Sequence, residues 1–303
     1  MSAWLNSPLT TWKEMTLNKL RIYLACALLF LLCACGASGT GIAADPTPYP
    51  DGITQGSTVN PAHLTHPQAI TVFAAASLTD AFLEIGQAFE SVYPGITVNY
   101  SFAGSQVLRT QLEQGASADV VAFADQENMA LLVSDALVAS DTYSIFATNR
   151  MIVILPASNP AKLKTLADLA RPGIQLVLAD NSVPAGRYAR QILSKISQDP
   201  LYGAEYGSQV LANVVSNETD VRQVVTKVEL GEADAGIVYA SDELSAESLI
   251  TIPIPAQYNV IAQYPIAPLS ASVNHDLAAA FIAFSTSQAG QEILSKWGFT
   301  PVN

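Results

Sequence analysis

A serine and several small residues separate an apolar run from an amphipathic pattern in residues 72–82. The apolar run predicts a buried strand, while Phe82, Ile85 and Phe89, spaced three and four apart, predict the apolar face of a helix. The first backbone N–H groups of a helix lack intrahelical partners and carry part of a positive charge. Together with the hydroxyl of Ser77, these groups could hold an anion. Small residues are also common at crowded turns and serine is an ordinary N-cap, so a purely structural role stays open.

Two later turns have the same features. Ser105 follows the small residues 103–104 at the end of another predicted strand, where either an anion donor or a plain N-cap fits. Pro184 suits the first position of a helix, where its missing N–H costs nothing. Ala185 and Gly186 then offer backbone donors that no long side chain covers.

Two further candidate donors follow in the second half of the chain. Thr219 or Asp220 can cap a helix and leave the N–H of Val221 pointing outward. Tyr239 ends a short apolar run with its hydroxyl available. These turns therefore supply neutral hydrogen-bond donors, although the carboxylates of Asp220 and of the earlier Asp80 are near enough in sequence to matter.

The composition limits the partners. The chain has 303 residues, half of them apolar, which is enough for one two-lobed domain or two small ones. Its formal charge of −12 argues against nucleic acid, since binding to a phosphate backbone requires a basic face. An anionic ligand would have to be held by local dipoles and hydrogen bonds against the overall field. No cysteine follows Cys35, so the folded part has no disulfide framework and no thiolate metal site.

Residues 1–35 have the features of a secretion signal. Lys19 and Arg21 precede the apolar run 22–32, which is too short to span a membrane as a helix. We therefore expect the folded part to lie outside the cytoplasmic membrane. The Pro-rich residues 36–67 cannot bury a core, and we expect them to form a flexible tether.

The end of the signal segment resembles a bacterial lipobox, with Cys35 as the lipidated residue. Cys33 is a weaker candidate because Phe30 would occupy an aliphatic position. An uncleaved N-terminal anchor is the alternative, and Met15 is an alternative start to Met1. A lipidated chain would be held at the cell membrane by its lipid.

Short apolar runs alternate with helical patterns from residue 68 onward. Such alternation is typical of α/β proteins with mainly parallel sheets, where ligands bind at the carboxyl ends of the strands. After the first strand, the predicted strands cover residues 96–102, 119–123, 151–155, 174–178 and 236–239. Besides the two helices that follow Ser77 and Ser105, predicted helices cover residues 185–197, 221–230 and 275–287.

Taken together, these motifs resemble the periplasmic molybdate-binding proteins of ABC importers. The match keeps order and spacing from about residue 68 to residue 299, nearly all of the folded part. Each motif is only moderately specific, but the whole set in sequence is a strong signal. The motifs are VFAAASLT at 72–79, SFAGS at 101–105, QGASADV at 114–120, VPAG at 183–186, DVR at 220–222, GIVY at 236–239 and KWGF at 296–299.

The resemblance implies a two-lobed type II periplasmic-binding-protein fold with the ligand in a cleft between the lobes. One lobe would be 68–147 plus 263–303 and the other 148–262, with crossings near 146–149 and 262–265. Gly104 replaces a serine that some relatives carry, which should loosen that loop more than remove a ligand contact. The oxyanion contacts carried over by the resemblance are Ser77 and Ser105 (hydroxyl and N–H), the N–H groups of Ala185 and Val221, and the Tyr239 hydroxyl.

The chemistry of these five donors fits a tetrahedral dianion. Molybdate, tungstate or sulfate has only acceptors at neutral pH, whereas phosphate monoanion keeps a proton and requires an acceptor in the site. Molybdenum would be bound only as its oxyanion, without direct metal coordination and without a cofactor. The nearest basic residues, Arg109, Arg187 and Arg222, fall within the first turns of their helices. We interpret them as groups at the rim or groups that close the lobes.

Other classes of protein have weaker support. His275 is the only histidine after residue 67, and no nucleophile-elbow, zinc-protease or P-loop motif is present. An enzyme is therefore not expected, and a receptor or adhesion lipoprotein is the remaining alternative. We expect a monomer that delivers molybdate or tungstate to an ABC transporter permease. A binding protein for sulfate or another tetrahedral oxyanion is the alternative function.

Overall fold

The computed structural model describes residues 68–246 and 248–302, which lie in the compact unit Ile53–Asn303. The predicted signal peptide 1–35, its Cys35 and the tether 36–67 lie outside these residues. Among the helices of the described part, none is both long and apolar enough to cross a bilayer.

Ten strands in the described part form a continuous sheet in the order β2-β1-β3-β9-β4-β7-β5-β6, with β8 and β10 also paired to β4. All of the predicted strands are present. The bounds are β1 Gln68–Ala75, β2 Ile96–Ala103, β3 Val120–Ala122, β4 Ser144–Pro156, β5 Leu176–Ala179, β6 Val214–Glu218, β7 Ala235–Tyr239, β8 Leu249–Pro253, β9 Ile261–Pro268 and β10 Thr300–Pro301.

Parallel pairs do not predominate in this sheet, so the prediction of mainly parallel sheets is wrong. β1 pairs in parallel with β2 and β3, and β5 pairs in parallel with β6 and β7. β4 instead runs antiparallel to β7, β8, β9 and β10, and β9 runs antiparallel to β3. Because β4 and β9 each run against their neighbours, the alternation of strand and helix does not give a uniform strand direction.

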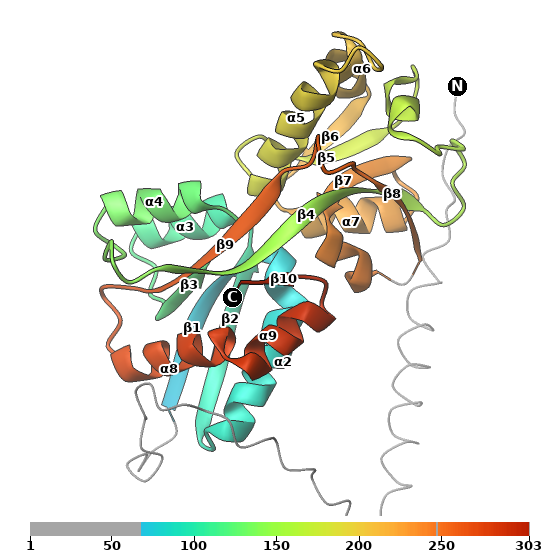
Figure 1. Ribbon diagram of the computed structural model, residues 1–303. Coiled ribbons are helices and arrows are strands. Elements are labelled where there is room, and N and C mark those ends of the chain that lie inside the picture. The colour runs from blue at the N-terminus through green and yellow to red at the C-terminus, as the bar shows by residue number, and fades with distance from the viewer. Residues whose placement is uncertain (1–67, 247, 303) are drawn as a thin grey trace, which may run out of the picture. The chain divides into compact units, whose positions relative to one another are not determined.

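Strand β4 divides the sheet into two parts. Up to Arg150 it pairs with β9 and β10, and from Met151 onward it pairs with β7 and β8. We call the strands joined to residues 144–150 of β4 sheet A (β2, β1, β3, β9 and β10), and those joined to residues 151–156 sheet B (β8, β7, β5 and β6). Figure 1 shows β4 running from sheet A into sheet B beside β9. The exact residues at which the chain divides into lobes stay a prediction.

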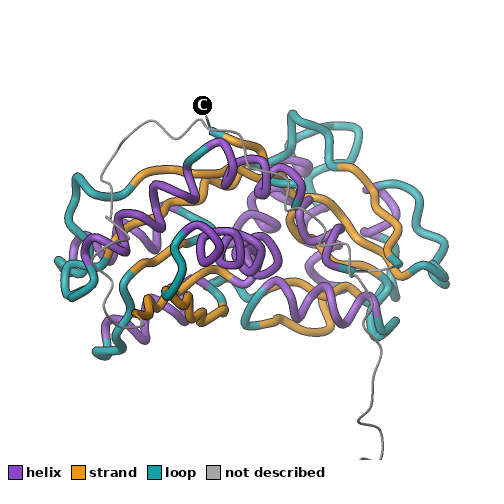
Figure 2. Tube along the Cα trace, turned by 90° about the horizontal axis from the view of Figure 1, so that it is seen from below, coloured by secondary structure: helices purple, strands orange, loops and turns teal. Residues whose placement is uncertain are grey.

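Helices cover both sheets. Figure 1 shows α3 and α4 on one side of sheet A and α2, α8 and α9 on the other, and Figure 2 shows helices on both sides of the strands in the turned view. The predicted helices 185–197, 221–230 and 275–287 agree with α5, α7 and α8 to within one residue at each end. The α-helices are α2 Thr79–Val92, α3 Ser105–Glu113, α4 Gln126–Ser134, α5 Pro184–Ser197, α6 Tyr206–Ala212, α7 Val221–Glu229, α8 His275–Thr286 and α9 Gln288–Lys296, and the 3-10 helices are η2 Ala76–Leu78, η3 Leu166–Ala170 and η4 Ala240–Ser245.

The predicted apolar face of α2 is confirmed. Phe82, Ile85 and Phe89 are each fully buried. The Phe82 ring packs against the rings of Phe146 and Phe281, with centroids 5.6 and 6.0 Å away. These contacts fix α2 against sheet A and thereby fix the position of the turn that precedes it.

Replacing Phe82 by alanine should remove this anchor. Loss of a fully buried phenylalanine costs about 3–5 kcal/mol, because both the transfer energy and the packing around the ring are lost. Leu83→Ala is the matched control, because Leu83 is the next residue on the same helix and its side chain is 45% exposed. Urea unfolding monitored by circular dichroism gives the free energy of unfolding of both variants. A similar loss of stability in both would contradict this account of the core.

Candidate functional site

The five donor residues predicted from the sequence line one small cavity between sheets A and B. Each of them lies at or just after the carboxyl end of a strand, which is where α/β proteins bind ligands. Ser77 and Ser105 follow β1 and β2 of sheet A, and Ala185 and Val221 follow β5 and β6 of sheet B, where Tyr239 ends β7. The remaining lining residues are Ala75, Ala76, Gly104, Ala124, Val183, Pro184 and Asp220.

Three helices begin at this cavity. Helix α3 begins at Ser105 and α7 at Val221, so each directs its first backbone N–H groups to this region. Helix α5 begins at Pro184, which has no N–H, so Ala185 supplies the first donor there. The partial positive charges of three helix N-termini therefore meet at one place, which favours a bound anion.

Neither site serine caps a helix with its side chain, so the alternative interpretation of both as N-caps is wrong. The turn after β1 is the 3-10 helix η2, which contains Ser77, and α2 then starts with Leu78 as its N-cap. Gly104 is the N-cap of α3, and Ser105 is its first helical residue. Both serines are almost fully buried, at 2% and 1% exposed. Their hydroxyls are therefore available for contacts other than capping.

The hydrogen bond of Ser105 leaves its proton free for donation, and that of Ser77 does so when Tyr264 is the donor. The Ser105 hydroxyl oxygen accepts a bond from the Ala124 N–H at 3.0 Å. The Ser77 oxygen lies 3.1 Å from the Tyr264 hydroxyl, and either group can donate. When Tyr264 donates, Ser77 can in turn donate to a ligand.

Tyr239 carries a buried hydroxyl that interacts with the neighbouring Tyr264 hydroxyl. The residue is 1% exposed, and its ring packs edge-on against Tyr264, with centroids 5.7 Å apart. Burial raises the pKa of Tyr239 well above its usual value, so the phenol keeps its proton at neutral pH. An anion in the cavity would give this buried hydroxyl a charged acceptor, which forms a stronger hydrogen bond than a neutral one.

Tyr264 supports the site from behind and was not predicted. Its side chain is fully buried, contacts Ser77 through its hydroxyl and packs against Tyr239 and Phe299. The sequence of β9 gives no signal for this role, because a buried tyrosine in an alternating strand resembles any other core residue.

The carboxylates of Asp80 and Asp220, which lie close to the donor residues in the sequence, both form hydrogen bonds with other residues. Asp220 lines the cavity, but its carboxylate caps α7 by accepting bonds from the backbone and side-chain N–H groups of Gln223. The Asp80 carboxylate accepts a bond from Arg222 at 2.7 Å. The charge of Asp80 is thus balanced by Arg222, whereas Asp220 is directed to the start of α7 by its bonds to Gln223.

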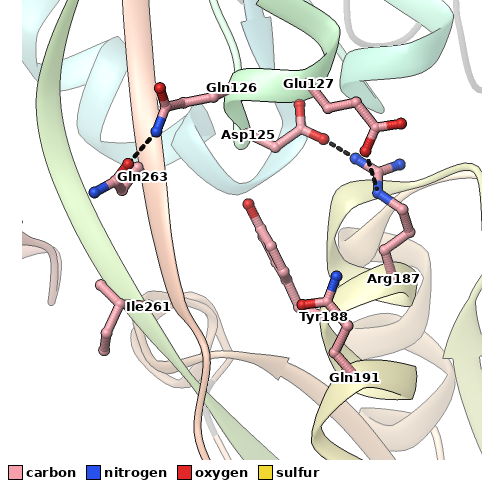
Figure 3. Close-up of a pocket in the computed structure, with 8 residues that line it drawn as sticks. All are labelled: Asp125, Gln126, Glu127, Arg187, Tyr188, Gln191, Ile261 and Gln263. Carbon is pink, nitrogen blue, oxygen red and sulfur yellow. Dashed lines mark hydrogen bonds and ion pairs between the residues drawn. The ribbon is translucent and has the colours of Figure 1, made fainter.

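The three nearby arginines do not line the cavity. Arg109 pairs with Glu113 on its own helix α3. Arg187 reaches from α5 to Asp125 and Glu127 at the start of α4, as Figure 3 shows for a second, outer cavity. This geometry agrees with the interpretation of Arg187 as a residue that joins sheet B to the elements around sheet A.

Two glycines allow close approach of backbone at the site. A Cβ on Gly186 would lie 2.0 Å from the Asp180 carbonyl oxygen, so only glycine lets α5 begin this close to the end of β5. A Cβ on Gly104 would lie 2.5 Å from the carbonyl oxygen of Thr219, which belongs to the other side of the cavity. The φ of Gly104 is an ordinary −59°, so this glycine provides space for the approach rather than a special backbone conformation.

The cavity also lacks the features of a metal centre. No group of three or more histidine, cysteine, aspartate or glutamate side chains that could hold a metal ion occurs in the described part of the chain. The five donor residues suit an oxyanion, in which any metal atom is already surrounded by oxygen.

The fold and the cavity between its two sheets define a periplasmic-binding-protein fold. The sequence model of bacterial extracellular solute-binding proteins matches residues 70–300, and the chain belongs to this family. The predicted fold class and resemblance are thus confirmed. The family binds solutes, so the expectation that the chain is not an enzyme is confirmed as well, as is a location outside the cytoplasm.

Three similar proteins illustrate the match. The chain is 40% identical over 269 residues to the molybdate-binding protein ModA of Mycobacterium tuberculosis, which covers 88% of this chain and 92% of the relative. The structure of the periplasmic molybdate-binding protein of Azotobacter vinelandii aligns with a TM-score of 0.67 at 18% identity, covering 77% of this chain and all of that one. The sulfate-binding protein SubI of M. tuberculosis aligns with a TM-score of 0.69 at 21% identity, covering 78% and 88%.

Proposed function

We propose that this protein captures molybdate, or the similar ion tungstate, outside the cytoplasm and delivers it to the permease of an ABC transporter. The 40% identity to a molybdate-binding relative over nearly the whole chain supports this function. The structural observation that carries the proposal is that all five donor residues, including the buried Tyr239, line one cavity.

The five donor residues divide the work of binding. Ser77 and Ser105 donate hydroxyl and backbone N–H groups, Ala185 and Val221 donate backbone N–H groups, and Tyr239 donates its phenol. Hydrogen bonds to a charged group contribute about 1.5–3 kcal/mol each, so a handful in a closed cavity suffices for tight binding. The protein touches only the oxygens, and molybdenum needs no protein ligand.

A dianion is favoured over phosphate because the donor set contains no acceptor. Protonated phosphate would require an acceptor for its hydroxyl, and none of the five donor groups supplies a carboxylate. Sulfate is the second candidate, because it is also a tetrahedral dianion and the fold of SubI is similar. Size then decides between sulfate and the larger molybdate or tungstate.

We further propose how the protein is held in the cell. Lipidation at Cys35 would anchor the chain to the membrane, and residues 36–67 would tether the binding unit. Lobes 68–147 plus 263–303 and 148–262 would close on the ion as a monomer, since cleft closure is the usual motion of such folds. A closed complex would then be the form presented to the permease.

A competitive titration of the purified protein tests the proposed ligand. Molybdate and tungstate should each give saturable heat with one ion per chain and should displace one another. Sulfate should bind more weakly, and phosphate should not compete. Absence of saturable heat with molybdate, or tighter binding of sulfate, would overturn the proposal.

Removal of single donors should weaken molybdate binding in a defined order. We expect Ser77→Ala and Ser105→Ala to reduce affinity at least tenfold, because each loses a short donor in the cavity wall. Tyr239→Phe should reduce it less, because one donor is lost while the ring stays packed. Ser91→Ala is the control, since this exposed serine on α2 bonds only the Gln87 carbonyl. A larger loss for Tyr239→Phe than for Ser77→Ala would mean that the roles are misassigned.

A further inference from the structure

Arg222 joins the two sides of the anion cavity. It is the second residue of α7, directly after the donor residue Val221. Its Nη2 donates to the Asp80 carboxylate at 2.7 Å. Asp80 lies in the first turn of α2, three residues after Ser77. The ion pair therefore connects a helix that follows sheet B to a helix that follows sheet A.

The same guanidinium also contacts a carboxylate behind Tyr239. The Nε atom of Arg222 lies 3.2 Å from Oδ1 of Asp242, whose side chain is fully buried. The other carboxylate oxygen of Asp242 accepts the backbone N–H of Tyr239 at 3.0 Å. Burial raises the pKa of Asp242 to about 7, while the charge of Arg222 opposes that rise. Asp242 thus holds the guanidinium against the end of β7.

Arg222 is paired with the Asp80 carboxylate and lies against the buried Asp242 side chain, and it does not line the cavity. An arginine at this sequence position could in principle have bound the anion directly. Its ion pair with Asp80 instead directs it across the gap between the sheets. Its contribution to binding would then be geometric, through the relative position of α2 and α7.

We propose that Arg222 is a positioning residue for the anion site, and that its ion pair with Asp80 holds Ser77 at the spacing from Val221 and Tyr239 at which all can donate to one ion. This inference rests on the proposed function. The Asp80 side chain is 30% exposed, so its pair with Arg222 adds little to the stability of the fold. A small free energy is enough to shift an equilibrium between open and closed forms, however, and a ligand that binds the closed form then dissociates more slowly.

Asp80→Asn gives a test in which simple electrostatics and the positioning role predict opposite results. Removing a negative charge near an anion site should by itself strengthen binding and speed association. If the ion pair holds the cavity closed, the variant should instead release molybdate at least fivefold faster in stopped-flow experiments. The thermal midpoint of the ligand-free protein should stay within about 2 °C of the wild type, given the exposure of the pair.

The matched control is Glu113→Gln, which removes an ion pair with Arg109 within α3 alone and should leave the dissociation rate unchanged. In addition, Asp80→Asn made in an Arg222→Gln background should have no further effect, since the partner is already gone. Wild-type release kinetics from Asp80→Asn, or tighter binding, would overturn the role of Arg222 while leaving the proposed function intact. Absence of molybdate binding to the wild type would reject both.

Discussion

A doubly negative ion inside a protein of net charge −12 has to be held by positive charge that is strictly local. The N-termini of α3, α5 and α7 supply that charge at the cavity, and the hydroxyls of Ser77 and Tyr239 add neutral donors. Because these groups come from both sheets, no single element forms the site. The rest of the structure serves to bring the ends of its strands together at one spacing.

The supporting parts of the fold follow from this requirement. The aromatic anchor around Phe82 fixes the turn that carries Ser77, and Tyr264 lies behind both Ser77 and Tyr239. The arginines nearest the cavity are paired with carboxylates, and the pairs of Arg187 and Arg222 join different elements of the fold. No arginine or lysine is among the described residues that line the cavity, so the five donor residues offer only uncharged donors.

The features that could be predicted from the sequence are those that depend on residues close together in the chain. The apolar runs and the helix starts at Pro184 and Val221 were readable, because strand burial, proline placement and capping depend on neighbouring residues. Strand β9 could not be predicted, because Pro265 and Pro268 disfavour a strand there. Its direction could not be predicted either, because it depends on pairing with strands far away in the sequence. Tyr264 was missed for a related reason, because its bond to Ser77 joins residues 187 positions apart in the sequence. That the five donors form one site was predicted from the family resemblance. In the structure these residues line one cavity.

The most direct test of the central claim is a crystal structure of the protein with molybdate, with anomalous scattering recorded on both sides of the molybdenum absorption edge. The account predicts one anomalous peak between Ser77, Ser105, Ala185, Val221 and Tyr239, with hydroxyl and amide groups within hydrogen-bond distance of the oxygens and no lysine or arginine nitrogen in contact. A peak elsewhere, or one bound by an arginine or accompanied by a free carboxylate, would contradict it.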